Sequence, residues 1–485
     1  MKFMKRFFWK ICGMMLITTV VSAGAKEDAL IDKLVLAYGG EALLSLKSLT
    51  LMDNLKRFTS GQSYSPTEVD LSHYNTVVKI DFENGRKELQ LIGGEGKHIY
   101  ARHQFYDGEK GYGINHTDQT VMENSSYRFT TVDRRFSLRI DALLVKLLHD
   151  NQEDAKYEGK VLYRGKSHEK ISFEAEGYPK LTLYIDQVTG LITKMTRPHW
   201  APNTEFSYVY TGHEIQDAIP FAKGVYVTKG GKPETLSVSR SLVLNPDLTG
   251  AFHIPSSYGA APKSMSFTDM SVKELSEGVY LAGQDWGFSI FVDAGDHFVA
   301  VGGYEDLKKR LAAVQVYAET EKPLKYQIVT HHHLDHLGGM GEAMELGAVF
   351  VTVKEHVASI RAIVGKPIPD DRFILIDGAG SVGNDLVKLV DFPNGHASHN
   401  LVSYIPGAKT VFTADYFLSR QETGAPDGHN GLVKFKETLR DHNFDADYFA
   451  AAHSGRVLTA ADLQEAMNNI APPEVCPVGW SQCEE

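Results

Sequence analysis

The hydrophobic pattern changes about half way along the chain of 485 residues. Up to about residue 258, short runs in which apolar and polar residues alternate dominate, as in 76–82 and 181–186. This period of two is typical of half-buried antiparallel strands. Helical spacing is confined there to 26–38 and 137–148. Residues 26–258 are therefore predicted to form a mostly antiparallel, curved β domain.

After residue 267, compact apolar runs typical of buried strands alternate with segments of helical spacing. The predicted strands include 278–283, 288–294 and 326–330. The predicted helices are 304–320, 338–346, 353–364, 431–443 and 459–470. Strands with helices between them indicate a layered α/β domain over residues 267–485, with 259–266 as the linker.

Three histidines and an aspartate follow the apolar run 326–330 directly: His331, His333, Asp335 and His336. A strand that ends in a short turn can direct all four side chains into one pocket. Imidazole nitrogen and carboxylate oxygen suit zinc and related metals, and a catalytic site adds an open position to about three protein ligands. The alternative is a solvated polar turn that is rich in histidine. The motif favours a metal site.

The pattern His-x-His-x-Asp-His resembles the signature of the metallo-β-lactamase superfamily. Three later positions resemble, in the same order, those at which that family supplies its other ligands: His396 before the run 401–405, Asp415 after 410–414, and His453 after 449–452. The resemblance implies two packed β-sheets with helices outside (an αββα sandwich) and metals at one edge.

The resemblance also implies a binuclear site. His331, His333 and His396 would hold one metal, Asp335, His336 and His453 would hold the other, and Asp415 would bridge them. Zinc is the expected metal, with iron or manganese as alternatives. Two divalent ions about 3.5–4 Å apart lower the pKa of a shared water, so that hydroxide can attack an acyl carbonyl at neutral pH. By the same resemblance, Asp335 is the catalytic carboxylate that takes up a proton.

Other histidines have different expected roles. His332 lies between two ligand positions and should point away from them, and His356 is expected to be a solvated residue of a helix. His399 and Asn400 are candidates for substrate contact, and His399 is also an alternative to His396 as ligand.

One position departs from the family pattern. The strand predicted at 297–304 has glycine where the family usually has an aspartate behind the metals. Losing a group that orients metal ligands often lowers metal affinity 10–100-fold. We therefore expect the metals to be supported differently or bound more weakly.

Two short motifs in the first half resemble the half-barrel fold of periplasmic lipoprotein carriers. They are the sequence Tyr-Gly-Gly-Glu-Ala at 38–42 and the hairpin at 185–192. This resemblance implies a sheet that curves over helices, and it makes a lipophilic ester or acyl compound a natural substrate.

Residues 1–25 have the features of a secretory signal peptide. Four basic residues, the last of them Lys10, precede the mostly apolar stretch 11–22, and Ala23-Gly24-Ala25 is a small-x-small cleavage site. The apolar stretch is short for an uncleaved membrane anchor, which is the alternative. The protein is therefore predicted to be periplasmic or secreted, where Cys476 and Cys483 could form a disulfide or stay free.

The net charge argues against nucleic acid as a partner. Cleavage after Ala25 removes four basic and no acidic residues, which takes the formal charge from −11 to −15. An acidic surface repels phosphate backbones. No later apolar stretch is long enough to span a bilayer, so no stable membrane span is expected after cleavage.

These features predict a binuclear metal-dependent hydrolase that cleaves an ester, lactone, thioester or related acyl bond of a small molecule. By the family resemblance, a bridging aspartate is typical of hydrolases of thioesters, lactones and phosphodiesters rather than of β-lactamases. Two alternatives stay open: an iron-dependent redox enzyme of the same fold, and a lipid- or ligand-binding carrier whose metal domain is not catalytic.

Overall fold

The computed structural model describes residues 23–95, 98–199 and 204–470 of the chain. Most of the predicted signal peptide lies outside these residues, as do Cys476 and Cys483, so the signal peptide and the disulfide stay predictions. Within the described ranges, no helix combines the length and the apolar character needed to cross a membrane.

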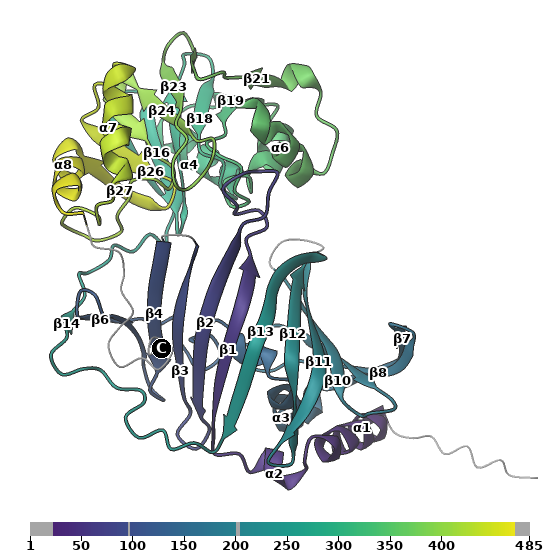
Figure 1. The fold of residues 1–485 in the computed structure, drawn as a ribbon. Helices are drawn as coiled ribbons and strands as arrows, with labels where there is room; N and C mark the ends of the chain where they lie inside the picture. The colour runs from purple at the N-terminus through teal and green to yellow at the C-terminus, as the bar shows by residue number, and fades with distance from the viewer. Residues whose placement is uncertain (1–22, 96–97, 200–203, 471–485) are drawn as a thin grey trace, which may run out of the picture.

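The first half of the chain forms one long curved sheet (Figure 1). Among the described residues it has fourteen strands in the order β14-β6-β5-β4-β3-β2-β1-β13-β12-β11-β10-β9-β8-β7. The strands are β1 Ser48–Phe58, β2 Leu71–Asp81, β3 Arg86–Glu95, β4 His98–Tyr106, β5 Gly111–Asn115, β6 Thr120–Glu123, β7 Lys156–Tyr163, β8 Lys166–Phe173, β9 Leu181–Asp186, β10 Ile192–Pro198, β11 Glu205–Gln216, β12 Ile219–Lys229, β13 Lys232–Leu244 and β14 Gly259–Ala260. Every pairing is antiparallel except that of β14 with β6. The predicted antiparallel β domain is confirmed, and β14 places the start of the predicted linker in this sheet.

Three helices cover one face of this sheet: α1 Ala23–Ala37, α2 Glu41–Leu44 and α3 Asp141–Asp150. Leu34, Leu43 and Leu144, one from each helix, share a buried core with the inward residues of the strands. The helix expected at 137–148 begins later, because the 3₁₀ turn η1 (Phe136–Arg139) precedes it.

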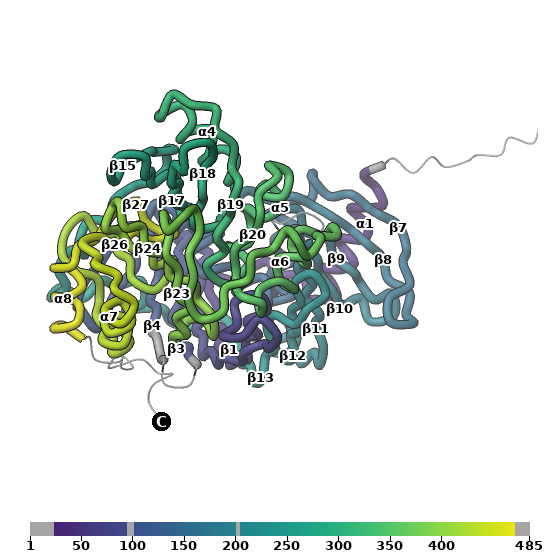
Figure 2. Tube along the Cα trace, turned by 90° about the horizontal axis from the view of Figure 1, so that it is seen from above, coloured from purple at the N-terminus to yellow at the C-terminus, as the bar shows by residue number. Residues whose placement is uncertain are grey.

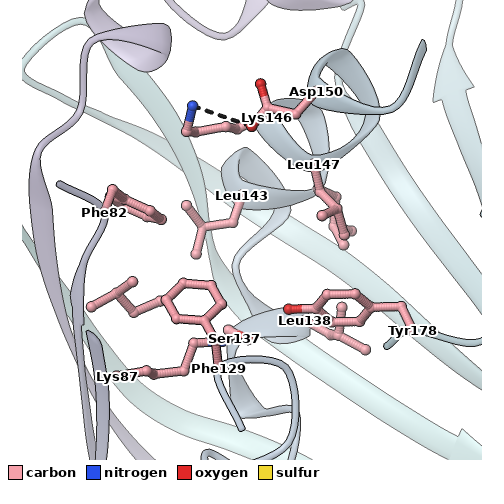
Figure 3. A pocket seen from close by; sticks show the side chains of 12 residues that line it. Phe82, Lys87, Phe129, Ser137, Leu138, Leu143, Lys146, Leu147, Asp150 and Tyr178 are labelled. Carbon is pink, nitrogen blue, oxygen red and sulfur yellow. Dashed lines mark hydrogen bonds and ion pairs between the residues drawn. The ribbon is translucent and has the colours of Figure 1, made fainter. Parts of the chain in front are cut away.

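A cavity of about 120 Å³ lies between α3 and the sheet (Figure 3). Leu143 and Leu147 of α3 and the rings of Phe82 and Phe129 line it, together with the buried side chain of Lys87. The mostly apolar lining is compatible with the resemblance to lipoprotein carriers, which stays a prediction.

The second half of the chain contains two further sheets. Within the described residues, one has the order β15-β16-β17-β18-β19-β20-β21 and the other β22-β23-β24-β25-β26-β27. The first consists of β15 Ser271–Ser276, β16 Val279–Gln284, β17 Gly287–Asp293, β18 Phe298–Val301, β19 Leu324–Ile328, β20 Val349–Thr352 and β21 Phe373–Leu375. The second consists of β22 Ala379–Val382, β23 Val387–Asp391, β24 Leu401–Ile405, β25 Thr410–Phe412, β26 Tyr448–Ala451 and β27 Ser454–Thr459. The helices are α4 Leu307–Tyr317, α5 Met340–Glu345, α6 Val357–Val364, α7 Gly431–Asp441 and α8 Ala460–Asn468.

These elements form four layers. Ile290 of the first sheet and Leu401 of the second belong to one buried core between the sheets. Leu311 of α4 packs in a second core outside the first sheet, and Phe435 of α7 packs in a third core outside the second sheet. Seen from above, α7 and α8 lie on one side and α5 and α6 on the other (Figure 2). The predicted αββα sandwich is confirmed.

A buried ion cluster fixes β1 in the large sheet. Alternation along β1 directs Leu51, Asp53 and Leu55 toward the core. Asp53 Oδ2 accepts a hydrogen bond from Arg139 Nε at 2.9 Å and lies 3.4 Å from Arg240 Nε. Because Arg139 belongs to η1 and Arg240 to β13, the cluster ties β1 to both elements. The chain continues from β1 into the loop of residues 59–70, which reaches the upper domain in Figure 1.

We expect Asp53→Ala to destabilise the protein by on the order of 3–5 kcal/mol, because it leaves two buried guanidinium groups without their carboxylate. Denaturant unfolding followed by circular dichroism measures the change. Asn54→Ala, at the exposed neighbouring position of the same strand, should cost less than about 1 kcal/mol. Equal losses in the two variants would contradict a special role of the cluster.

Candidate metal centre

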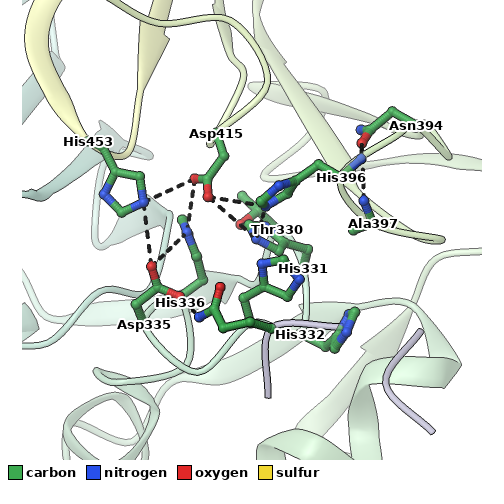
Figure 4. A network of polar contacts seen from close by, with 12 residues as sticks. Thr330, His331, His332, Asp335, His336, Asn394, His396, Ala397, Asp415 and His453 are labelled. Carbon is green, nitrogen blue, oxygen red and sulfur yellow. Dashed lines mark hydrogen bonds and ion pairs between the residues drawn. The ribbon is translucent and has the colours of Figure 1, made fainter. Parts of the chain in front are cut away.

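The predicted ligands come from four chain segments that meet at one edge of the sandwich (Figure 4). His331, His333, Asp335 and His336 lie in the turn after β19, which is closed by a hydrogen bond from His336 N to His333 O at 3.0 Å. His396 precedes β24, Asp415 follows β25, and His453 lies in the tight turn between β26 and β27.

Local turn chemistry sets the position of two of these ligands. Asn394 Oδ1 accepts hydrogen bonds from the backbone N–H groups of His396 at 2.8 Å and Ala397 at 3.2 Å, an Asx turn that presents the His396 ring. Ala414 is buried with φ of 53°, a left-handed conformation that is uncommon for alanine. Such strain is typical of functional sites, and here it orients the next residue, Asp415.

The ligand atoms form two groups that share Asp415. One group is His331, His333, His396 and Asp415, and the other is Asp335, His336, Asp415 and His453. Within each group, one ligand atom per residue lies within 4.8 Å of all the others. All seven predicted metal ligands are thus brought together, in the two sets that the sequence predicts.

The two oxygens of Asp415 face different groups. Oδ2 lies 3.2 Å from His396 Nε2 and 3.9 Å from His331 Nε2. Oδ1 lies 2.9 Å from His336 Nε2 and 3.3 Å from His453 Nε2. One carboxylate between two sets of imidazoles is the arrangement that a ligand bridging two metals requires.

The spacing of the donor atoms fits metal ions. Ligands of a tetrahedral zinc ion at 2.0–2.1 Å lie about 3.3 Å apart. Here His396 Nε2 lies 3.2 Å from His331 Nε2, and Asp335 Oδ2 lies 3.5 Å from His453 Nε2. His333 Nδ1 is buried and has no hydrogen-bond partner in the described part of the chain. A metal would satisfy it.

Hydrogen bonds on the other ring nitrogens select the tautomers that can bind metal. His453 Nδ1 donates to the carbonyl oxygen of Trp286 at 2.6 Å, which leaves Nε2 facing the carboxylates. His333 Nε2 donates to the carbonyl oxygen of Ser63 at 3.0 Å, which leaves Nδ1 as its ligand atom. Metal-binding histidines usually donate their second ring nitrogen in this way.

Burial and mutual charge set the protonation of the centre. Burial lowers the pKa of His333 to about 3, so this ring is neutral, as a ligand must be. Burial acts to raise the pKa of Asp415, but the charge of His336 and the hydrogen bonds from three histidines hold it well below its usual range. For His453, burial is outweighed by Asp335 and Asp415, which raise its pKa to about 10. A metal must therefore displace a proton from His453.

Comparison with known proteins agrees with this geometry. Residues 311–453 match the sequence model of the metallo-beta-lactamase superfamily. Residues 311–453 therefore carry a metallo-beta-lactamase superfamily domain.

Several solved metallo-beta-lactamase structures are similar to part of this chain. The enzyme from Pontibacter korlensis is 19% identical, with 41% of this chain and 98% of that chain covered and a TM-score of 0.34. FIM-1 from Pseudomonas aeruginosa, in its mono-zinc form, is 18% identical, with 43% and 96% covered and a TM-score of 0.33. The enzyme from Hirschia baltica is 17% identical, with 41% and 96% covered and a TM-score of 0.32.

His332 and His356, neither of which is a predicted ligand, are buried. His332 is 3% exposed, donates from Nε2 to the carbonyl oxygen of Ser63 at 2.9 Å and belongs to neither ligand group. The expectation that His356 is solvated is wrong. Its side chain is fully buried and its Nδ1 lies 3.1 Å from Thr352 Oγ1, because the turn before α6 folds it inward.

The two candidates for substrate contact have different environments. His399 Nδ1 lies 2.6 Å from Asp391 Oδ2, and the His399 side chain is 30% exposed, so it remains open to a substrate. His396, and not His399, belongs to a ligand group. Asn400 is only 2% exposed, and its backbone N–H donates to Asp391 Oδ1. The structure therefore does not support the expected substrate contact of Asn400.

The missing acid behind the centre has a steric explanation. A Cβ atom on Gly303 would lie 2.1 Å from Met340 Cε and 2.7 Å from the carbonyl oxygen of His336. Gly302 has φ of +88°, and a Cβ atom there would lie 2.9 Å from Phe412 Cζ. Neither position has room for aspartate, so the ligands need support from elsewhere.

Sequence reasoning missed three residues that contact the ligands. Ser63 and Trp286 act through their backbone carbonyl oxygens, and Gln62 Nε2 donates to Asp335 Oδ1 at 2.7 Å. Gln62 and Asp335 are 273 positions apart in the sequence. No motif marks these residues, because a backbone carbonyl can be supplied by any residue type.

We expect Asp415→Ala to reduce bound metal to at most one ion per chain under conditions in which the unaltered protein binds two, because both groups lose their shared oxygen donor. Elemental analysis of the purified proteins measures this. Asp441→Ala removes an exposed carboxylate at the end of α7 and is the matched control. Equal metal contents in both variants would contradict the bridging role.

Proposed function

We propose that the protein is a binuclear metal-dependent hydrolase, with zinc as its metal, that cleaves an ester, lactone or thioester bond in a small molecule. The observation that best supports this proposal is the orientation of Asp415, whose two oxygens face two different histidine groups. A centre with a single iron ion would not need the second ligand group, which consists of Asp335, His336, Asp415 and His453. The arrangement therefore favours hydrolysis over iron-dependent redox chemistry.

The side chains of the protein would hold the metal ions and orient the reacting groups, and Asp335 would take up a proton. When bound, two divalent ions polarise a substrate oxygen and lower the pKa of water. Asp335 is 28% exposed and directs Oδ2 toward His453, while Gln62 holds Oδ1. Burial opposes its ionisation, but His453 and His336 lower the pKa of its carboxyl below the usual range. An ionised and accessible carboxylate beside the reacting groups can accept a proton.

The bridging aspartate argues against β-lactams as the substrate. By the family resemblance, this residue is typical of hydrolases of thioesters, lactones and phosphodiesters rather than of β-lactamases. His399 is suited to contact the substrate, since it is partly exposed and Asp391 fixes its ring.

Exposed apolar side chains around the centre support a lipophilic substrate. Trp286 is 55% exposed, and the centroid of its ring lies 6.0 Å from that of the His453 ring. Leu334, between the ligands His333 and Asp335, is 36% exposed. An acyl chain lying on these side chains would remove apolar surface from water.

The features of residues 1–25 support action in the periplasm or outside the cell. The net charge of −15 after removal of these residues is compatible with a small-molecule substrate and disfavours a nucleic acid.

The proposal predicts hydrolysis that depends on metal. Removing the metal with a chelator should abolish turnover of ester, lactone or thioester substrates, and added zinc should restore it. Asp335→Ala should lower kcat/KM by roughly 10²–10⁴-fold, through loss of a metal ligand and a proton acceptor. Asp441→Ala is the control. One iron per chain with oxygen consumption, or no stoichiometric metal, would overturn the proposal.

The exposed side chains of Trp286 and Leu334 predict that KM depends on the length of the acyl chain of the substrate. Trp286→Ala should raise KM for an octanoyl ester several-fold and leave KM for the acetyl ester nearly unchanged, with kcat preserved, because the backbone carbonyl that holds His453 remains. Steady-state kinetics with both esters test this. Trp286→Phe should retain most of the preference, and Val316→Ala, at an exposed site on α4, should have no effect. A loss equal for both esters would contradict a role in chain recognition.

A further inference from the structure

The loop between β1 and β2, residues 59–70, lies against the metal centre although it belongs to the large N-terminal sheet. Gln62 Nε2 donates to Asp335 Oδ1 at 2.7 Å. The carbonyl oxygen of Ser63 accepts hydrogen bonds from the rings of both His332 and His333, at 2.9 and 3.0 Å. This loop therefore contacts one predicted ligand from each metal group.

Backbone hydrogen bonds join the same loop to the turns that carry the ligands. Leu334 N donates to Gly61 O at 3.0 Å, and Ser398 N donates to Tyr64 O at 2.8 Å. These bonds reach the turn after β19 and the segment that carries His396. The contact is thus a continuous interface along two sides of the centre rather than a single side-chain contact.

The close approach at Gly61 shows that the loop fits this surface. A Cβ atom on Gly61 would lie 2.4 Å from Leu334 Cδ1 and 2.5 Å from its Cγ. Gly61 also has φ of +78°, which side chains disfavour. Glycine therefore allows the loop to approach the ligand turn this closely.

The loop is held in one conformation by its own hydrogen bonds. Thr59 N donates to Asp70 O at 3.1 Å, and Gln62 N donates to Thr59 O at 2.8 Å. Tyr64 N donates to the carboxylate of Asp70, and Ser63 Oγ donates to Thr59 O at 3.0 Å. A loop fixed in this way can orient the groups that it contacts.

The two oxygens of Asp335 have separate partners. Oδ2 lies 3.6 Å from His336 Nε2 and 3.5 Å from His453 Nε2, on the side of the predicted metal. Oδ1 accepts from Gln62. A hydrogen bond on the oxygen that does not face the metal restricts rotation of the carboxylate, which is how groups around a metal site orient its ligands.

Ser63 acts on His333 in the equivalent way. Its carbonyl oxygen can only accept, so His333 Nε2 must carry the proton and Nδ1 is left with a lone pair. His333 Nδ1 is buried without a hydrogen-bond partner among the described residues.

We propose that the β1–β2 loop is part of the metal centre, with Gln62 and the Ser63 carbonyl as positioning groups for Asp335 and His333. Metal binding by the metallo-beta-lactamase domain then depends on the N-terminal domain, which supplies support that Gly302 and Gly303 leave no room for on the other side. This inference rests on the proposed metal site but adds a role for the N-terminal domain that is independent of lipid binding.

The test is metal titration of the full-length protein carrying Gln62→Met, which keeps the length of the side chain and removes its N–H donor. With zinc and a competing chelator, affinity for the second metal should fall about 10–100-fold, while affinity for the first changes little. Titration with cobalt should show an altered visible spectrum for the second ion.

Matched variants separate positioning from folding. Glu68→Gln changes an exposed residue of the same loop and should bind both metals as the unaltered protein does. Gly61→Ala should push the loop away from Leu334 and weaken binding of both metals. Circular dichroism and the melting temperature of the metal-free proteins report on folding.

The outcomes distinguish this inference from the proposed function. If the unaltered protein binds no metal, both fail. If it binds two metals and Gln62→Met binds them with the same affinities and cobalt spectrum, the loop inference alone is overturned.

Discussion

Two histidine groups around one buried carboxylate are the constraint on which the site depends. The Asp415 side chain is only 14% exposed, and a buried carboxylate is costly unless positive or hydrogen-bonding groups surround it. Three separate turns bring such groups to it, and the left-handed backbone at Ala414 orients it. The sandwich meets this requirement because its strand ends place these turns and Asp415 at one edge. Packing between the two sheets therefore determines the geometry of the centre.

Much of the centre could be predicted because four of its ligands form a local motif, and because the resemblance of that motif to the metallo-β-lactamase signature implied the other three. His331 to His336 lie within one turn, and His396, Asp415 and His453 each lie beside a strand of the second sheet. Periodicity alone could not give the environment of His356 or Asn400. His356 is buried by a 3₁₀ turn at the start of α6, and the backbone of Asn400 is held by Asp391, so both depend on contacts that hydrophobic patterns do not encode.

The contacts made by Gln62 and Ser63 could not have been predicted, for a different reason. They depend on how the two halves of the chain pack together, and one of them uses a backbone carbonyl. The glycines at 302 and 303 gave only the indirect indication that support must come from elsewhere. Steric clashes at Gly302 and Gly303 exclude a supporting side chain, and the β1–β2 loop supplies hydrogen bonds to the ligands. Such bonds hold ligands in place before a metal binds.

The position of the loop follows in turn from β1. Asp53 pairs with Arg139 and Arg240 below the loop, so β1 is fixed to η1 and β13 before it leaves the sheet. Hydrogen bonds to Asp70 then close the loop, and Gly61 allows it to approach Leu334. The ion cluster thus restricts β1, β1 restricts the loop, and the loop restricts the carboxylate of Asp335. The N-terminal sheet therefore has a structural reason to be joined to the metal domain, whether or not its own cavity binds a ligand.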